Sequence, residues 1–382
     1  MTRYLVVDVD GHITEPMDLW PHYLDPAFHD RAPRLVQTQD GVDAIFFEGA
    51  VHVPAFGGMG MLAAGSAGQG LGPRTMYERR YAECHPGGFE PKARLQAMDL
   101  EGIDAALLFP TFSAPMIALM PDEAFAVALA RAYNNWLADF CRASSDRLYG
   151  AAQVPFIHID ASIREARRAV TDLGMKMIYL RPNPYVGRAW TDPIYDPFWS
   201  CLQDLDVPIA FHEGTFPEAI PTAGADRFQN FFFHHVVSHP FEQQLACLSF
   251  VAGGVLERFP RLKVVFMEAG CGWLPYWLER MDGHHEHIGW MVPELTMKPS
   301  EYFKRQCYIS LDPDEKDLLH VATAIGADKL LFASDFPHYD AVFPGAVAAI
   351  RDRESLTPEA KRLILGENAA RLLGLDVGAL TP

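Results

Sequence analysis

The sequence lacks paired cysteines, long apolar runs and an excess of positive charge. Its six cysteines are scattered without a Cys-x-x-Cys pair, which indicates reduced residues rather than a disulfide framework. No stretch reaches about 18 uncharged apolar residues, so no membrane span is predicted. Lys and Arg number 32 against 49 Asp and Glu, a net charge of −17 that disfavours binding to nucleic acid or anionic membranes. The first residues show no secretory signal pattern, and we therefore expect a cytoplasmic protein.

Two common functional motifs are also absent. There is no Gly-x-Ser-x-Gly nucleophile elbow. No Gly-rich phosphate-binding turn follows the first apolar run, which ends in Asp10-Gly11-His12, and this disfavours the alternative fold, a doubly wound open sheet. What the sequence does contain is a 49% hydrophobic fraction, enough for a large core, and 15 histidines.

Eight short apolar runs are spread along the 382 residues. Most are nearly continuously apolar, which is typical of strands buried on both faces in a parallel sheet. The runs cover residues 4–10, 104–109, 148–154, 175–181, 207–212, 263–268, 306–311 and 329–335.

The segments between these runs carry helical periodicity. Apolar residues recur at spacings of three and four between 125 and 140, between 163 and 173, and between 241 and 259. Eight strand-then-helix units predict an α/β fold, a (β/α)8 TIM barrel that forms one domain over residues 1–382.

A long insertion follows the first predicted strand, from about residue 19 to residue 90. It contains a Gly-rich piece at residues 56–61 whose spacing matches neither a P-loop nor a dinucleotide fingerprint. We expect a surface element that serves as a lid over the barrel mouth or as a subunit interface.

Metal-ligand residue types follow three of the predicted strands. In a (β/α)8 barrel, the C-terminal ends of the strands face the active-site mouth. Asp10 and His12 lie two apart on an extended chain and point to the same side, while His212 and Asp335 end the fifth and eighth strands. Imidazole and carboxylate ligands suit Zn²⁺, Mn²⁺ or Fe²⁺. Taken alone, each motif is weak, because Asp10 or Asp335 could cap a loop and His12 could be a core histidine.

Several motifs together resemble the amidohydrolase superfamily. The similarity is to the branch that contains aminocarboxymuconate-semialdehyde decarboxylase and γ-resorcylate-type decarboxylases. The matching segments are Asp8-Val9-Asp10-Gly11-His12-Ile13-Thr14-Glu15-Pro16, Phe211-His212-Glu213-Gly214, Phe259-Pro260-Arg261-Leu262-Lys263-Val264-Val265, Phe332-Ala333-Ser334-Asp335-Phe336-Pro337-His338 and Gly366-Glu367-Asn368-Ala369-Ala370-Arg371-Leu372.

The resemblance implies one divalent metal ion, Zn²⁺ or Mn²⁺, bound by Asp10, His12, His212 and Asp335. Two departures from the family pattern stand out. The first motif is Asp-x-His rather than His-x-His, and the second carboxylate favours Mn²⁺ somewhat more than a histidine would. Glu268 occupies the position after the sixth strand where several relatives carry a proton-transferring histidine. That role then passes to Glu268 or to another residue such as His239, which is expected to lie at a helix start.

A small-molecule carboxylate is the expected substrate. An arginine fork at a barrel mouth is well shaped to hold a carboxylate, so Arg181, with Asn183 and His338, is predicted to bind substrate. For Arg181 the alternative is a structural ion pair. Relatives are often dimers or larger, and we therefore expect a homo-oligomer, most simply a dimer.

Two chemistries fit a single open metal site. One is non-oxidative decarboxylation of an aromatic or unsaturated carboxylate, which the resemblance favours. The other is hydrolysis of a C–N, ester or C–C bond, in which Asp335 takes a proton from metal-activated water. A barrel that binds without turnover is the third possibility.

The run His284-His285-Glu286-His287, predicted to follow a helix over residues 273–281, is interpreted as adventitious surface histidines.

Overall fold

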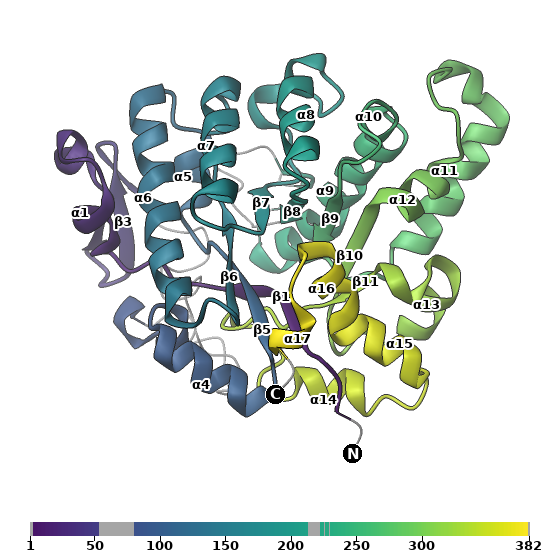
Figure 1. Ribbon diagram of the computed structural model, residues 1–382. Helices are drawn as coiled ribbons and strands as arrows, with labels where there is room; N and C mark the ends of the chain where they lie inside the picture. The colour runs from purple at the N-terminus through teal and green to yellow at the C-terminus, as the bar shows by residue number, and fades with distance from the viewer. Residues whose placement is uncertain (1–2, 53–79, 213–221, 225, 229, 381–382) are drawn as a thin grey trace.

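An eight-stranded parallel sheet forms the centre of the molecule in the computed structural model (Figure 1). The structure describes residues 3–52, 80–212, 222–224, 226–228 and 230–380. Along the sheet the order is β1-β5-β6-β7-β8-β9-β10-β11. These strands are β1 (Val7–His12), β5 (Ala105–Phe109), β6 (Leu148–Ala152), β7 (Met177–Leu180), β8 (Ile209–His212), β9 (Val264–Met267), β10 (Cys307–Leu311) and β11 (Leu330–Phe332).

The sheet closes on itself through the segment that follows β11. Asp335 N donates to Asp10 O at 2.8 Å, and His12 N donates to Phe336 O at 2.7 Å. Both bonds join the end of β1 to the loop after β11. The predicted (β/α)8 barrel is therefore confirmed, and its closure brings two of the predicted ligand segments side by side.

A bulge in β1 decides which of its side chains enter the barrel. Asp8 pairs with Ala106 and Gly11 with Leu108, so one extra residue is inserted between them. Val7 and Val9 belong to the apolar cluster inside the barrel. Without the bulge, strict alternation would point Asp10 and His12 outward. The extra residue resets the alternation and turns both side chains toward the interior.

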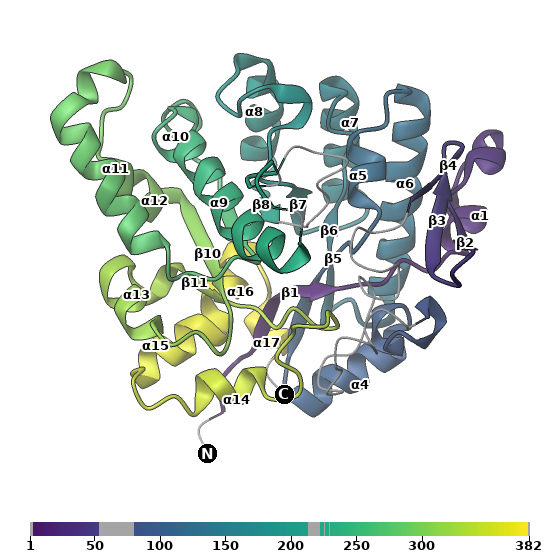
Figure 2. The same cartoon turned by 180° about the vertical axis from the view of Figure 1, so that it is seen from behind.

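Helices surround the barrel and bury its outer surface (Figures 1 and 2). The predicted stripe at residues 125–140 lies on α6, whose Phe125, Leu129 and Phe140 are buried in the layer between helices and strands. The helices are α1 (Leu19–Tyr23), α4 (Pro91–Glu101), α5 (Ala114–Ala118), α6 (Glu123–Cys141), α7 (Ile159–Thr171), α8 (Asp196–Asp204), α9 (Phe231–Val251), α10 (Val255–Arg258), α11 (Leu274–Ile288), α12 (Pro299–Gln306), α13 (Leu318–Ile325), α14 (Ala346–Arg351), α15 (Pro358–Arg362), α16 (Asn368–Leu373) and α17 (Val377–Leu380).

The C-terminal helices close the end of the barrel opposite the predicted mouth. Ala369, Ala370, Leu372 and Leu373 of α16 join the same apolar cluster as the interior strand residues. Both chain ends lie at this end of the molecule (Figure 1). Access to the interior must therefore come from the C-terminal ends of the strands.

The insertion after β1 contains a small sheet of its own. Its antiparallel strands are β2 (Arg34–Gln37), β3 (Asp43–Phe47) and β4 (Ala50–His52), and they lie beside α1 and α6 at the edge of the molecule (Figure 1). The Gly-rich piece at 56–61 lies outside the described residues. The role of the insertion as a lid or an interface, and the assignment of the whole chain to one domain, stay predictions.

Two helix boundaries differ from the sequence prediction. His239 lies inside α9 rather than at a helix start, because α9 continues through Pro240. The histidines at 284, 285 and 287 lie inside α11 rather than after it. Within the described residues, no helix is both long and apolar enough to cross a membrane.

Candidate metal centre and active site

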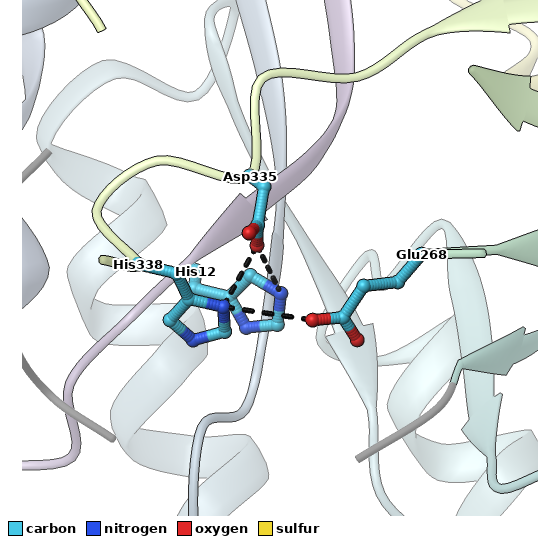
Figure 3. A group of neighbouring side chains, drawn as sticks. All are labelled: His12, Glu268, Asp335 and His338. Carbon is cyan, nitrogen blue, oxygen red and sulfur yellow. Dashed lines mark ion pairs between the residues drawn. The ribbon is translucent and has the colours of Figure 1, made fainter. Parts of the chain in front are cut away.

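Side chains from the ends of β1 and β8 and from the loop after β11 meet inside the barrel mouth. Asp10 Oδ1 lies 2.9 Å from His212 Nε2 and 3.2 Å from His12 Nε2. Asp335 Oδ1 lies 3.5 Å from the same His12 nitrogen (Figure 3). The structure thus brings together the four residues predicted to bind a metal, and three of them are about 1% exposed.

Glu268 and His338 complete the cluster. Glu268 follows β9 and approaches from the side of the mouth opposite His12 (Figure 3). Its Oε2 lies 3.1 Å from His212 Nδ1, and its Oε1 lies 3.7 Å from His338 Nδ1. His338 Nδ1 is also 2.7 Å from Asp335 Oδ1, and the His338 ring stacks on His12 with centroids 3.9 Å apart.

The proton positions on the histidines follow from their partners. His12 Nδ1 lies 3.0 Å from the carbonyl of Pro110, which can only accept, so this nitrogen carries the hydrogen. His212 Nδ1 in turn donates to Glu268 Oε2. In both rings Nε2 then presents a lone pair, and each lone pair faces a carboxylate oxygen. Such opposed acceptors repel each other unless a metal ion or an added proton lies between them.

The spacing of the ligand atoms also fits one ion. Two ligand atoms at about 2.1 Å from a metal, separated by 90–110°, lie roughly 3.0–3.4 Å apart. The distances of 2.9 and 3.2 Å from Asp10 to His212 and His12, and of 3.5 Å from His12 to Asp335, lie within about 0.1 Å of this range. The ligand atoms of Asp10, His12 and His212 all lie within 4.8 Å of one another, and so do those of His12, Glu268, Asp335 and His338. A divalent ion is therefore compatible with Asp10, His12 and His212, with Asp335 joined to them through His12, and Nδ1–H bonds to Pro110 and Glu268 fix the orientation of both imidazoles.

The electrostatic surroundings of Asp10 and His12 favour the forms of these residues that bind a metal, whereas burial raises the pKa of Asp335. Burial would raise the pKa of Asp10, but the neighbouring His212 and His12 outweigh it and hold this pKa below its ordinary value. Burial and the nearby charge of His338 lower the pKa of His12 to about 3, so His12 is neutral. An ionised carboxylate and a neutral imidazole are the forms that bind a metal.

Glu268 and Asp335 have an unusual backbone conformation. Their φ angles are 53° and 56°, in the left-handed region that non-glycine residues seldom adopt. The other non-glycine residues with positive φ in the described part of the chain are Glu48 and Asp206. Such conformations cost on the order of 1–3 kcal/mol each and gather at functional sites, where they aim a side chain.

A cavity of about 260 Å³ opens beside this cluster. Asp10, Glu268 and Asp335 line it together with His239 and His235. The pKa of His239 lies well below its ordinary value, because burial and the charge of His235 and of more distant neighbours disfavour its protonated form. The structure therefore brings the second proton-transfer candidate to the same cavity, from the middle of α9.

Arg181 and Asn183 lie just beyond β7 and are fully buried. Arg181 Nε donates to Asn183 Oδ1 at 3.3 Å. Burial raises the pKa of Glu242, and the charge of Arg181 offsets only part of that rise. The same charge is among those that lower the pKa of His239. These two predicted substrate-binding residues therefore lie at the end of β7, and they are not among the described residues that line the cavity beside the ligands.

Sequence reasoning missed Asp8 and Arg94, two ionisable residues that form hydrogen bonds with the backbone of the ligand segments. Asp8 accepts from Asp10 N at 3.1 Å, from Ser334 N at 2.9 Å and from Ser334 Oγ at 2.6 Å, so it ties β1 to the residue before Asp335. Arg94 of α4 contacts the same region. A buried carboxylate within a strand is the signal that could have identified Asp8, whereas the position of Arg94 needs the three-dimensional structure.

Comparisons with known proteins found a matching family model and several relatives. A family model described as amidohydrolase matches residues 7–375. A γ-resorcylate decarboxylase of Rhizobium radiobacter is 29% identical over 308 residues, covering 74% of this chain and 86% of the relative. A 2-amino-3-carboxymuconate-6-semialdehyde decarboxylase of Dictyostelium discoideum is 26% identical over 298 residues, covering 78% of this chain and 80% of the relative.

Solved structures share the barrel. An amidohydrolase of Mycobacterium avium subsp. paratuberculosis K-10 superposes with a TM-score of 0.79 at 24% identity, covering 98% of this chain and 100% of the other. A dihydroxybenzoic acid decarboxylase of Polaromonas sp. JS666, solved with bound manganese and 2-nitroresorcinol, has a TM-score of 0.68 at 19% identity and covers both chains completely. At these identities the likeness shows the fold.

Proposed function

The chain belongs to the amidohydrolase family, as its motifs predicted, and from that premise we propose that it catalyses metal-dependent, non-oxidative decarboxylation of an aromatic or unsaturated carboxylate. The single observation that carries the proposal is the convergence of Asp10, His12 and His212 at ligand spacing inside the mouth, with Asp335 3.5 Å from His12. The decarboxylase activity of the two curated relatives supports the choice of reaction.

We assign one divalent metal ion to Asp10, His12, His212 and Asp335. Two carboxylates and two imidazoles suit Zn²⁺ and Mn²⁺, and the manganese in the Polaromonas structure supports the latter. When bound, the metal orients the substrate carboxylate or a neighbouring hydroxyl and stabilises its negative charge.

Glu268 is the proposed proton donor to carbon. When the bond to the carboxylate breaks, CO₂ leaves and its bonding electron pair stays on the carbon, which then needs one proton. Glu268 lies between His212 and His338, 3.7 Å from His338 Nδ1, so His338 can return a proton to it after each turnover. The lowered pKa of His239 keeps this imidazole neutral, which suits a hydrogen-bonding role toward the substrate better than an acidic one.

Arg181 and Asn183 are proposed to form the polar end of the substrate site, with His338 near the reacting group. The charge of the buried guanidinium contributes to the lowered pKa of His239, and His239 lines the cavity. An Arg charge in that position favours a carboxylate or phenolate on the substrate.

A homodimer is the proposed assembly. Phe241, Leu245 and Leu248 lie on one outward face of α9 and are 38–51% exposed. Ile288, the last residue of α11, and Met291, in the 3-10 turn Gly289–Met291 that follows it, are also exposed, and with Leu248 they line an apolar groove of about 370 Å³. A continuous apolar surface of this kind is typical of a subunit interface. We call these five residues the α9–α11 face.

The test is an assay of metal-stripped and reloaded protein against hydroxybenzoates and unsaturated carboxylates. We expect chelation to abolish activity, Mn²⁺ or Zn²⁺ to restore it, and CO₂ to appear in a 1:1 ratio with a product that carries one solvent hydrogen on carbon. In H₂¹⁸O, products of hydrolysis would carry ¹⁸O instead, and that outcome would contradict decarboxylation. Full activity in protein with far less than one metal per chain would contradict the metal site.

A further inference from the structure

Arg94 is a buried cation with no directly paired carboxylate. It lies on α4 and is 1% exposed, and among the described residues the charge of Asp8 acts on it without forming an ion pair. Burying a guanidinium is costly unless its N–H groups are satisfied. Its hydrogen-bond partners therefore indicate why the charge is retained.

The partners of Arg94 are three backbone carbonyls from three separate segments. Nε donates to Gly87 O at 2.8 Å, Nη1 donates to Phe336 O at 3.2 Å, and Nη2 donates to His12 O. The guanidinium carbon also lies 4.7 Å from the centre of the Phe336 ring. One side chain thus joins the end of β1, the loop after β11 and the last part of the insertion.

Each of these segments supports the proposed metal centre. His12 is a ligand, and Phe336 directly follows Asp335. Gly87 belongs to the 3-10 turn Pro86–Gly88, in which Gly88 O accepts from Thr14 N at 2.7 Å. The carbonyl of Phe336 receives both Arg94 and His12 N, at 3.2 and 2.7 Å. Displacing Arg94 would therefore loosen two ligands at once.

We propose that Arg94 is a positioning residue for the metal centre, whose guanidinium fork sets the separation of the His12 and Asp335 segments and joins the insertion to them. This inference rests on the metal-dependent function proposed above. Arg94 does not touch substrate or metal. It acts through the backbone of the residues that do.

The geometry requires arginine rather than any cation. A planar fork donates in three fixed directions, whereas a lysine ammonium is a compact charge that cannot span three carbonyls on different segments. Gly11, between the two ligands of β1, leaves room for the fork, because a Cβ there would lie 3.3 Å from Arg94 Nη1. The sequence thus combines a glycine at 11 with an arginine at 94.

The test compares Arg94→Lys with a matched control, Arg147→Lys. Arg147 also donates to two carbonyls, Asp104 O and Ile103 O, each at 2.9 Å, but it does so beside the N-terminal part of β5, away from the mouth. Because groups that orient ligands typically contribute 10–100-fold to metal affinity, we expect Arg94→Lys to weaken Mn²⁺ binding by roughly 10–100-fold, measured by chelator competition. Arg147→Lys should bind Mn²⁺ like the wild type.

Three readouts separate positioning from general stability. In Arg94→Lys at saturating Mn²⁺, kcat should fall while KM changes little, and the rise in Tm on adding Mn²⁺ should shrink. A variant that loses the same Tm with and without Mn²⁺, at wild-type Mn²⁺ affinity, would overturn the proposal. If the wild type itself binds no metal, the proposed function fails, which is a distinct result.

Hydrogen exchange on the wild type provides a test that does not depend on a variant folding. If Arg94 joins the three segments, Mn²⁺ should slow exchange in peptides that contain residues 10–14, 334–338 and 85–90 together. Protection of the first two without any change at 85–90 would contradict the link through Arg94.

Discussion

The position of Asp335 depends on residues that are far from it in the sequence. Its N–H is bonded to Asp10 O across the closure of the sheet, and its Oδ1 faces both His12 and His338. Its φ of 56° turns the carboxylate away from the direction in which β11 runs. The side chain therefore reaches the other ligands only when the barrel is closed.

Replacing this carboxylate with an amide should remove activity without removing the fold. Asn is among the residues that tolerate the left-handed region, so Asp335→Asn should keep the backbone and the Tm close to wild type. The amide carries no negative charge for the metal, and we expect kcat to fall by about 100-fold or more. Steady-state kinetics, thermal unfolding and metal content per chain measure these effects.

An exposed aspartate at the C-terminal end of α14 supplies the control for that variant. Asp352 pairs with Arg351 at the surface, so Asp352→Asn should retain wild-type kcat. If Asp335→Asn keeps a near-wild-type rate at full metal occupancy, Asp335 is not a ligand and the assignment is wrong.

Individual site residues were predictable where chemistry alone marks them. Asp10, His12, His212 and Asp335 are polar residues that end apolar runs, and such positions face the mouth of a barrel. Arg94 gave no such signal, because an arginine in a helix usually lies in solvent and only the tertiary structure shows that it is buried.

At the scale of elements, the sequence predicted the eight strands of the barrel but not the local details that tertiary packing determines. All eight apolar runs contain or overlap the observed strands. The bulge in β1 was not predicted, because a strand of alternating Val and Asp residues is compatible with either set of side chains facing the barrel interior.

The boundary of α9 was wrong for a related reason. Pro240 lacks an N–H and normally marks a helix start, so His239 was predicted to precede a helix. Tertiary contacts override that tendency. Gln243 Nε2 donates to Phe211 O at 2.6 Å and to Met267 O at 2.8 Å, which anchors α9 to the strand ends that carry His212 and Glu268.

The packing of the C-terminal segment against β1 can be tested with a single methyl group. At Gly366, before α16, a Cβ would lie 2.4 Å from the backbone oxygen of Leu5. Because backbone cannot move aside easily, Gly366→Ala should lower the free energy of unfolding by about 1–3 kcal/mol. The matched control is Gly283 of α11, where a Cβ meets nothing within 4 Å.

Gly283→Ala should instead stabilise by about 0.5–1 kcal/mol, because alanine is the better helix former. Urea unfolding of both variants at saturating Mn²⁺ gives the comparison. Equal stability of Gly366→Ala and wild type would mean that the C-terminal segment does not press against β1 as described.

At the scale of the whole molecule, one end of the barrel is closed and one flank is unusually apolar. Because α16 closes one end of the barrel, the mouth at the other end is the route to the site. The α9–α11 face lies on the outer side of the helix layer. Trp290, 76% exposed, adjoins that face directly after α11. A single chain rarely leaves this much contiguous apolar surface in water.

The proposed homodimer predicts the effect of one charge placed in that face. Leu245 is 48% exposed in the chain and would be buried between two copies, so Leu245→Glu would require burial of an unpaired carboxylate. In light scattering coupled to size exclusion, we expect the wild type to have twice the mass of one chain and Leu245→Glu to have the mass of one. Leu100→Glu is the control, because Leu100 is 72% exposed on α4 and lies outside the face, so that variant should remain dimeric. A monomeric wild type, or a Leu245→Glu variant that remains dimeric, would exclude this face as the interface.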